Sequence, residues 1–227
     1  MKVKVFVLAI LFTVFGVSGA SADIVLFDCA FFVDGTTYEK TLGDSMPTSG
    51  SLDASGLGTL TWTTSTAGPH NFIAFFDHEL SEAVNTFFNE YGSPGGPPPG
   101  AGISWEIDEP GYVFGNIYGH VLAGALDGLN AVPSGSPEDV SMAWGWNFNL
   151  AAGETATITL ALADTAPASG SYLRQTDPDS QEYVYFSGAL RTEGGGGPVI
   201  PEPATMMLFG SGLVGLAGLG RRKLFKK

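Results

Sequence analysis

Basic residues are scarce along most of this 227-residue chain, which holds only 10 lysines and arginines in total. Seven of them lie within the first four or the last seven residues, so only Lys40, Arg174 and Arg191 fall between Asp23 and Ile200. That stretch contains 22 of the 23 acidic residues, and its net charge is 3 − 22 = −19. Because proteins bind nucleic acids through clustered lysines and arginines, this composition excludes a nucleic-acid-binding function.

Cysteine and histidine are scarce as well. Cys29 is the only cysteine, which excludes an intrachain disulfide bond, and the adjacent Asp28 would raise the pKa of its thiol. The only histidines are His70, His78 and His120, and no G-x-S-x-G segment marks a nucleophilic serine. Because a hydrolytic triad needs a base beside a nucleophile, we expect a protein that is not an enzyme, with Cys29 buried in a strand.

The N-terminal residues have the three parts of an export signal. Two lysines open the chain, Val5–Val17 is an uncharged apolar run of 13 residues, and Ala20 and Ala22 occupy the small-residue positions of a cleavage site. Such a run, at about 1.5 Å per residue, is too short to cross a hydrocarbon core of about 30 Å. We therefore predict that a signal peptidase removes residues 1–22.

The C-terminal residues predict a membrane-spanning segment. Residues 204–220 are a run of 17 residues without a charged side chain, and a basic tail, residues 221–227, follows directly. Seventeen residues is a short span, which the flanking arginines can lengthen by snorkelling. By the positive-inside rule, Arg221, Arg222 and Lys223 anchor this end in the cytoplasm, so the preceding domain lies outside it.

A flexible linker and a proline motif precede that segment. The linker, residues 193–200, is rich in glycine and cannot join a packed core, so it would hold the folded domain away from the membrane. The tripeptide Pro201-Glu202-Pro203 follows the linker. Its two prolines fix their backbone φ angles at about −65° and keep the motif extended, which suits a peptide bound in the cleft of a processing enzyme.

The tripeptide, the apolar segment behind it and the arginine-containing tail together resemble the PEP-CTERM sorting signal of Gram-negative bacteria, over residues 201–227. The resemblance implies recognition by an exosortase, a membrane-embedded cysteine transpeptidase that cuts near the motif. It also implies export through the inner membrane, transient residence there as a single-pass precursor, and delivery to the cell surface or extracellular matrix. Because family members accompany exopolysaccharide production and biofilm formation, exopolysaccharide is an expected partner.

The central domain, residues 23–192, shows the alternation of β-strands. In 140–150 every second residue is large and apolar, and 155–162 alternates again after a turn at 151–154, so we predict that these two segments form a hairpin. Short strands between glycine- and proline-rich segments are typical of an antiparallel β-sandwich or jelly roll. Further strands are predicted at 24–33, 57–64, 71–77, 102–107, 111–116 and 182–190.

One short helix is predicted between two of these strands. A single face of a helix of 3.6 residues per turn would collect its apolar side chains, and a glycine at position 92 would end it. The residues on that face are Leu80, Ala83, Val84, Phe87, Phe88 and Tyr91.

Two groups of acidic residues are candidate calcium ligands. Asp77 and Glu79 lie at the expected junction of a strand with that helix, and Asp177, Asp179 and Glu182 follow a D-x-D-x-x-E spacing in one loop. Oxygen donors on loops suit Ca²⁺ better than Zn²⁺, which prefers histidine and cysteine. The alternative for the first group is stabilisation of a helix N-terminus by acidic side chains. The sequence requires no cofactor, and Ca²⁺ is the one candidate.

Two other features bear on function. Glu106 and Asp108 would point the same way from an alternating strand, as the paired carboxylates of a glycoside hydrolase or as a solvated acidic face. Trp144, Trp146 and Phe148 share one strand face, which predicts core packing unless they are exposed as a platform for sugars.

The leading hypothesis is a non-enzymatic surface or matrix component, processed by an exosortase. The alternative is a carbohydrate-binding or adhesive module, and a glycoside hydrolase comes third. An exposed aromatic strip would favour the binding module, a deep cleft between two carboxylates would favour the hydrolase, and a smooth acidic surface would favour the matrix component.

Overall fold

The computed structural model describes residues 24–81 and 86–194. The expected signal peptide with its cleavage alanines, Ala20 and Ala22, and the expected sorting signal at residues 201–227 lie outside the described residues. Within those two described ranges, no helix is both long and apolar enough to span a membrane.

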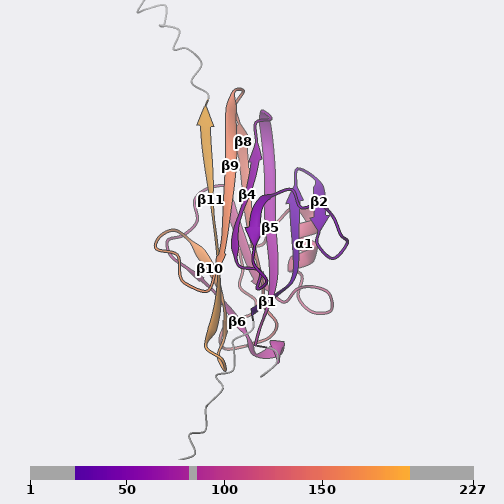
Figure 1. The fold of residues 1–227 in the computed structure, drawn as a ribbon, viewed down its shortest axis with the longest axis vertical. Helices are drawn as coiled ribbons and strands as arrows, with labels where there is room; N and C mark the ends of the chain where they lie inside the picture. The colour runs from indigo at the N-terminus through magenta and orange to yellow at the C-terminus, as the bar shows by residue number, and fades with distance from the viewer. Residues whose placement is uncertain (1–23, 82–85, 195–227) are drawn as a thin grey trace, which may run out of the picture.

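Two antiparallel sheets stack face to face, which confirms the predicted β-sandwich (Figure 1). Sheet A has five strands in the order β2-β1-β5-β8-β7, and sheet B has six in the order β3-β4-β9-β11-β10-β6. The strands of sheet A are β1 (Ile24–Val33), β2 (Thr36–Glu39), β5 (Gly68–Leu80), β7 (Ile103–Asp108) and β8 (Ser141–Leu150). Those of sheet B are β3 (Ser49–Leu52), β4 (Gly58–Thr64), β6 (Tyr91–Gly95), β9 (Glu154–Ala163), β10 (Tyr172–Asp177) and β11 (Glu182–Gly194).

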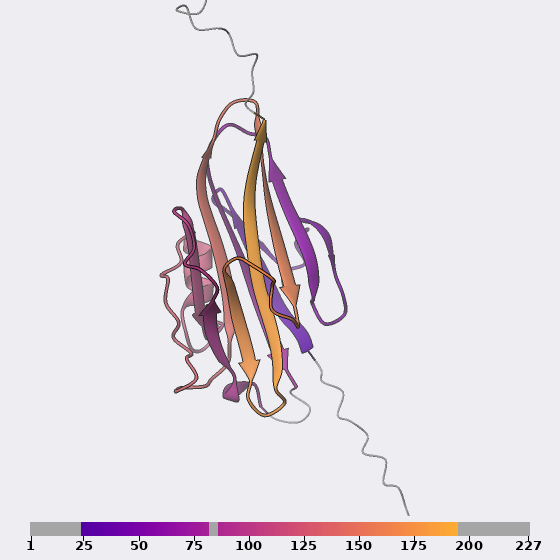
Figure 2. The same cartoon turned by 90° about the vertical axis from the view of Figure 1, so that its left-hand side faces the viewer.

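The main core lies between the two sheets. In Figure 2, β9, β10 and β11 face the viewer and sheet A lies behind them. Trp144 and Trp146 from sheet A pack into one buried cluster with Ile158, Leu160 and Phe186 from sheet B. The indole N–H of Trp144 donates a hydrogen bond across the core to the Phe186 carbonyl at 3.0 Å. The alternating residues of facing strands therefore supply the core, as their period of two predicts.

The outer face of sheet A is covered as well. Helix α1 (Ile117–Ala123) lies on the side of β1 and β5 away from sheet B (Figure 1), and its Ile117 and Val121 bury Ile73 and Phe75 of β5. This second cover explains why 141–146 of β8 is buried without interruption, although the sequence predicted only one buried face. The outer face of sheet A is thus an interior surface along much of its length.

The predicted helix around Leu80–Tyr91 is wrong. Leu80 is the last residue of β5, Phe87–Asn89 is a single 3₁₀ turn, and Tyr91 begins β6; two residues of the expected apolar face, Ala83 and Val84, lie outside the described residues. Only Leu80 of the expected face belongs to β5, so the helical spacing runs from the end of one strand through a 3₁₀ turn to the start of another and does not mark one helix.

Two other sequence predictions are corrected by the strand pairing. The segments 140–150 and 155–162 do not form a hairpin: β8 pairs with β5 and β7 in sheet A, whereas β9 pairs with β4 and β11 in sheet B. The turn at 151–154 therefore connects the two layers. The strand expected at 111–116 is a loop, and β11 extends to Gly194, so the first two residues of the expected linker pair with β9.

His70 on β5 fastens the turn between β1 and β2. Its Nδ1 lies 2.7 Å from Oδ2 of Asp34, and its Nε2 lies 2.7 Å from the Thr66 carbonyl oxygen. Because both partners are acceptors, this arrangement favours the imidazolium form, in which both ring nitrogens donate. Burial of the ring disfavours that charge, but the Thr66 carbonyl and the Asp34 carboxylate outweigh it and raise the pKa of His70 above 6.5.

We expect the stability that this contact contributes to be complete below pH ~6.5, the unfolded-state value, and to be lost as the pH rises through the raised folded-state pKa. In Asp34→Asn the negative charge is gone, so the pKa of His70 should fall and the decrease in melting temperature above neutral pH should become smaller. NMR titration of the His70 ring measures the pKa directly, and an unchanged value in the variant would contradict this account.

Candidate functional site

One rung of sheet A places three acidic residues and a serine side by side. Asp28 of β1 is opposite Asp77 of β5, Asp77 is opposite Ser141 of β8, and Ser141 is opposite Asp108 of β7. All four side chains are buried. Like charges directly opposite one another destabilise a sheet, and buried carboxylates need hydrogen bonds, protons or cations. The carboxylates of this rung therefore need hydrogen-bond donors, protons or cations from the groups that cover the sheet.

Asp28 and Asp77 differ in how many hydrogen bonds their carboxylate oxygens accept. Oδ1 of Asp28 accepts the Cys29 N–H at 2.8 Å, and Oδ2 accepts the Tyr112 hydroxyl at 2.8 Å. Oδ1 of Asp77 accepts the Ser141 hydroxyl at 2.8 Å, but no hydrogen-bond partner within the described part of the chain reaches its buried Oδ2. Burial above all, and then nearby carboxylates, raise the pKa of Asp77 well above its usual value.

Two further carboxylates converge on Asp77. Glu79, two residues along β5, lies on the same strand face, and Asp139 lies two residues before the first residue of β8. One oxygen from each of the three side chains lies within 4.8 Å of the others. The sequence placed Asp77 at the end of a strand and Glu79 at the start of a helix, whereas both residues belong to the strand β5.

Glu90 carries another buried carboxyl group near these residues. Its Oε1 accepts the Leu80 N–H at 2.9 Å, and its Oε2 accepts a hydrogen bond from the Gln175 amide. Burial raises the pKa of Glu90 to about 9, against the effect of these two hydrogen bonds, and the charges of Glu79 and Asp139 raise it further. Both oxygens of Glu90 thus accept hydrogen bonds from the protein, while burial makes this carboxyl group easier to protonate than an exposed one.

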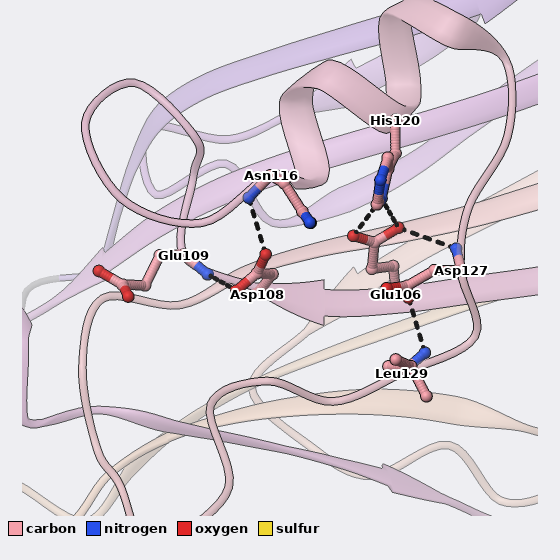
Figure 3. Close-up of polar contacts among 7 residues, drawn as sticks. All are labelled: Glu106, Asp108, Glu109, Asn116, His120, Asp127 and Leu129. Atoms are coloured by element: carbon pink, nitrogen blue, oxygen red, sulfur yellow. Dashed lines mark hydrogen bonds and ion pairs between the residues drawn. The ribbon is translucent and has the colours of Figure 1, made fainter.

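The loop 109–116 forms a wall beside the rung, and Asp108 closes it. Oδ1 of Asp108 accepts the Glu109 N–H at 2.8 Å and Oδ2 accepts the Asn116 N–H at 2.8 Å, so one carboxylate holds both ends of the loop (Figure 3). Within the loop, the Gly111 N–H donates to the Phe114 carbonyl at 2.8 Å. Asp108 thus acts as a loop anchor.

Between this wall and the strand ends lies a pocket of ≈ 320 Å³, which we call the acidic pocket. Its acidic lining consists of Asp77, Glu79, Glu109 and Asp139. Its apolar lining consists of Phe27, Phe88, Pro110, Tyr112, Val113 and Phe114. Most of the apolar group is exposed, with Phe27 at 56%, Val113 at 82% and Phe114 at 64%. Exposed aromatic side chains around a polar floor are typical of a binding site.

A second convergent group lies on the same face of sheet A, beneath α1. His120 of α1 points toward Glu106 of β7, and its Nδ1 lies 2.8 Å from Oε1 of that residue (Figure 3). The Asp127 N–H donates to Oε2 of Glu106 at 3.1 Å, and the Asp127 carboxylate accepts the Leu129 N–H at 2.8 Å. Ligand atoms of Glu106, His120 and Asp127 lie within 4.8 Å of one another. Both oxygens of Glu106 are nevertheless occupied by protein donors.

The predicted orientation of Glu106 and Asp108 is confirmed, but their predicted exposure is not. Glu106 and Asp108 do point the same way from β7, while Ile107 faces the main core. They are 1% and 7% exposed, so the interpretation as a solvated acidic face is wrong. The cause is α1 and the loop 109–116, which cover this face. Burial raises the pKa of Glu106, offset in part by the Asp127 N–H and by His120.

The D-x-D-x-x-E residues form the tight turn between β10 and β11. Oδ1 of Asp177 accepts the Asp179 N–H at 2.8 Å, and Oδ2 accepts the Ser180 hydroxyl at 2.7 Å. Glu182 accepts the Ser81 hydroxyl at 2.5 Å. Neither of the two convergent ligand groups in the described ranges contains these residues. The spacing is explained locally by side chains that stabilise a turn.

Other candidates are placed in the core. Trp144 and Trp146 are 3% and 1% exposed and Phe148 packs against the same buried cluster, which confirms core packing and removes the sugar platform on this strand. Cys29 is buried, and burial raises the pKa of its thiol to about 11, with the charge of Asp28 adding to the effect. The expectation that Cys29 is a buried strand residue is confirmed.

Sequence reasoning missed Asp28, Asp139, Tyr112 and His120 as members of these sites. Asp28 and Asp77 become neighbours only through the pairing of β1 with β5, and a β-bulge lies between Leu26 and Asp28. The exposed apolar run at positions 112–114, between a proline and a glycine, was the one signal that could have indicated a loop with a binding role.

The comparisons with known proteins bear on the C-terminal residues. The family model for the PEP-CTERM protein-sorting motif matches residues 199–223. The match contains the predicted motif and the predicted topology anchors: Pro201, Glu202, Pro203, Arg221, Arg222 and Lys223. The chain therefore carries a PEP-CTERM protein-sorting motif, which supports export and targeting to an exosortase as a membrane-anchored precursor. No curated protein and no solved structure matches the chain.

We expect Asp108→Asn to loosen the wall of the acidic pocket. An asparagine has one acceptor oxygen where the aspartate has two, so either the Glu109 or the Asn116 N–H loses its partner, at a cost of about 1–3 kcal/mol. Hydrogen exchange should then accelerate at these two amides. The exposed Asp164→Asn is the matched control. Unchanged exchange in Asp108→Asn would show that the loop does not depend on its anchor.

Proposed function

We propose that the exported domain is a non-enzymatic binding module of the cell surface or extracellular matrix, and that exopolysaccharide is its ligand. The observation that carries this proposal is the acidic pocket. Its volume of ≈ 320 Å³ falls at the lower end of the range for ligand sites, and exposed aromatic side chains surround its carboxylates. Of the features that distinguish the sequence hypotheses, an exposed aromatic surface favours a binding module.

The chemistry of the pocket suits a neutral saccharide. The apolar C–H face of a sugar ring packs against aromatic rings such as those of Tyr112 and Phe114, and sugar hydroxyls donate hydrogen bonds to carboxylates. An anionic polymer would be repelled, because residues 23–200 carry 3 − 22 = −19 charges. We therefore assign the pocket to uncharged sugar units.

Two features support a role without catalysis. The hydrogen bonds of the His120 side chain within the described ranges go to Glu106, so no serine or cysteine in them is activated by this base. The raised pKa of Cys29, about 11, keeps its thiol protonated. A glycoside hydrolase acting through Glu106 and Asp108 is disfavoured because Asp108 uses both oxygens to hold the loop 109–116.

Exosortase processing should be visible in the mass of the exported protein. We expect the mature chain to begin at Asp23 and to end near 201–204, without the apolar segment. Glu202→Ala should leave the precursor in the inner membrane, whereas Glu193→Ala, outside the motif, should be processed normally. Intact-mass spectrometry of protein from cells with and without the exosortase measures this. Full-length protein as the normal surface form would contradict the proposed route.

Binding should depend on the aromatic wall of the pocket. Phe114 is 64% exposed, so Phe114→Ala should leave the fold intact and weaken binding to purified exopolysaccharide by about tenfold or more. Leu42→Ala removes an equally exposed apolar side chain, 71% exposed, away from the pocket and is the control. Co-sedimentation of the exported protein with the polysaccharide gives the affinities. Equal binding by wild type and Phe114→Ala would exclude the pocket as the saccharide site.

A further inference from the structure

We propose that Asp77, Glu79 and Asp139 bind a calcium ion at the floor of the acidic pocket. This site is independent of whether the pocket also receives a saccharide. Two of the three carboxylates come from β5 and the third, Asp139, lies two residues before the neighbouring strand β8, and one oxygen of each lies within 4.8 Å of the other two. Oxygens in one Ca²⁺ shell, at about 2.3–2.6 Å from the ion, are at most about 4.6–5.2 Å apart. The three side chains can therefore share one ion without rearrangement of the backbone.

A second observation points to a ligand at this position. Asp77 is fully buried, it lines the pocket, and its Oδ2 has no hydrogen-bond partner within residues 24–81 and 86–194. An unsatisfied buried carboxylate oxygen is costly, and native structures avoid it. Glu90 shows the alternative solution in the same region, because its two oxygens are held by Leu80 and Gln175. A cation between Asp77, Glu79 and Asp139 would satisfy the oxygen that the protein leaves open.

The basic side chains of the domain are engaged elsewhere. Lys40 donates to the Leu26 carbonyl at 2.9 Å, Arg174 lies 5.7 Å from the centre of the Tyr183 ring, and Arg191 forms an exposed ion pair with its neighbour two residues on. One Ca²⁺ among the three carboxylates would offset two of their negative charges. The ion would thus relieve the repulsion that the Asp28–Asp77 rung creates.

The donor set selects calcium among common cations. All three ligands are carboxylates, whereas Zn²⁺ prefers histidine and cysteine. Mg²⁺ requires a tight octahedron at about 2.0–2.1 Å, while Ca²⁺ accepts six to eight oxygens in flexible arrangements. The pocket volume of ≈ 320 Å³ leaves room for water molecules to complete such a shell.

The other acidic groups do not offer the same opening. Both oxygens of Glu106 accept hydrogen bonds from His120 and Asp127, and both oxygens of Asp177 accept hydrogen bonds within its turn. A metal at either place would have to displace protein donors, whereas Oδ2 of Asp77 has none to displace. Of the two calcium groups that the sequence suggested, the structure thus favours the one with Asp77 and Glu79.

The test uses the exported protein, purified from the producing cells and treated with EDTA. Isothermal titration with CaCl₂ should show one site per chain. For a Kd of about 10⁻⁴ M, 1 mM CaCl₂ should raise the melting temperature by about 3–6 °C over NaCl at matched ionic strength. MgCl₂ should give a smaller rise. Asp77→Asn and Glu79→Gln should each abolish the calcium-specific shift, because each removes a charged ligand.

Asp179→Asn is the matched control, since it removes the same charge from the β10–β11 turn and should retain the full calcium response. If Asp77→Asn fails to fold, Glu79→Gln, which alters a less buried side chain, decides the question. Equal melting curves in CaCl₂ and matched NaCl would overturn the proposal, as would undiminished binding in Glu79→Gln. A larger shift with MgCl₂ than with CaCl₂ would overturn the assignment to calcium.

Discussion

The buried rung Asp28–Asp77–Ser141–Asp108 is the constraint on which the structure around the acidic pocket depends. Three carboxylates and a serine lie side by side on four adjacent strands. Charges of the same sign that face each other on neighbouring strands destabilise a sheet. Two of them are held by other parts of the chain: Asp28 by the Tyr112 hydroxyl, and Asp108 by both ends of the loop 109–116. The same bonds place the loop against the sheet. The hydrogen bonds that the buried carboxylates Asp28 and Asp108 require therefore also hold the wall of the acidic pocket in place.

This arrangement connects the composition of the chain with its route. Residues 23–200 contain 22 acidic and three basic residues, so few basic side chains can pair with the buried carboxylates of this exported domain. The carboxylates of Glu90 and Asp108 accept hydrogen bonds from N–H groups, and Glu106 contacts the ring of His120. Outside the cytoplasm, divalent cations are a further source of positive charge, which is the physical reason to expect one at Asp77. The sorting motif delivers the domain to that environment.

The strands and the sorting signal follow from local sequence, and the site does not. The segment 24–33 was predicted with the bounds of β1, and β4, β8, β9 and β11 were placed within a few residues, because each alternates or is flanked by turn residues. The hairpin of 140–150 with 155–162 failed because alternation gives a buried face and no partner. The sequence pointed to Asp77 and Glu79 as a pair. It did not point to Asp139 or to the acidic pocket, because these depend on the register of β5 with β1 and β8, which no short motif encodes.

The central claim is that the acidic pocket is built around a carboxylate that the protein alone does not satisfy. Diffraction from crystals of the exported protein grown with calcium tests it most directly. The account predicts one ion at about 2.3–2.6 Å from oxygens of Asp77, Glu79 and Asp139, with the loop 109–116 unmoved beside it. A pocket that holds only water, with Oδ2 of Asp77 hydrogen-bonded to a neighbouring carboxyl group through a shared proton, would contradict it.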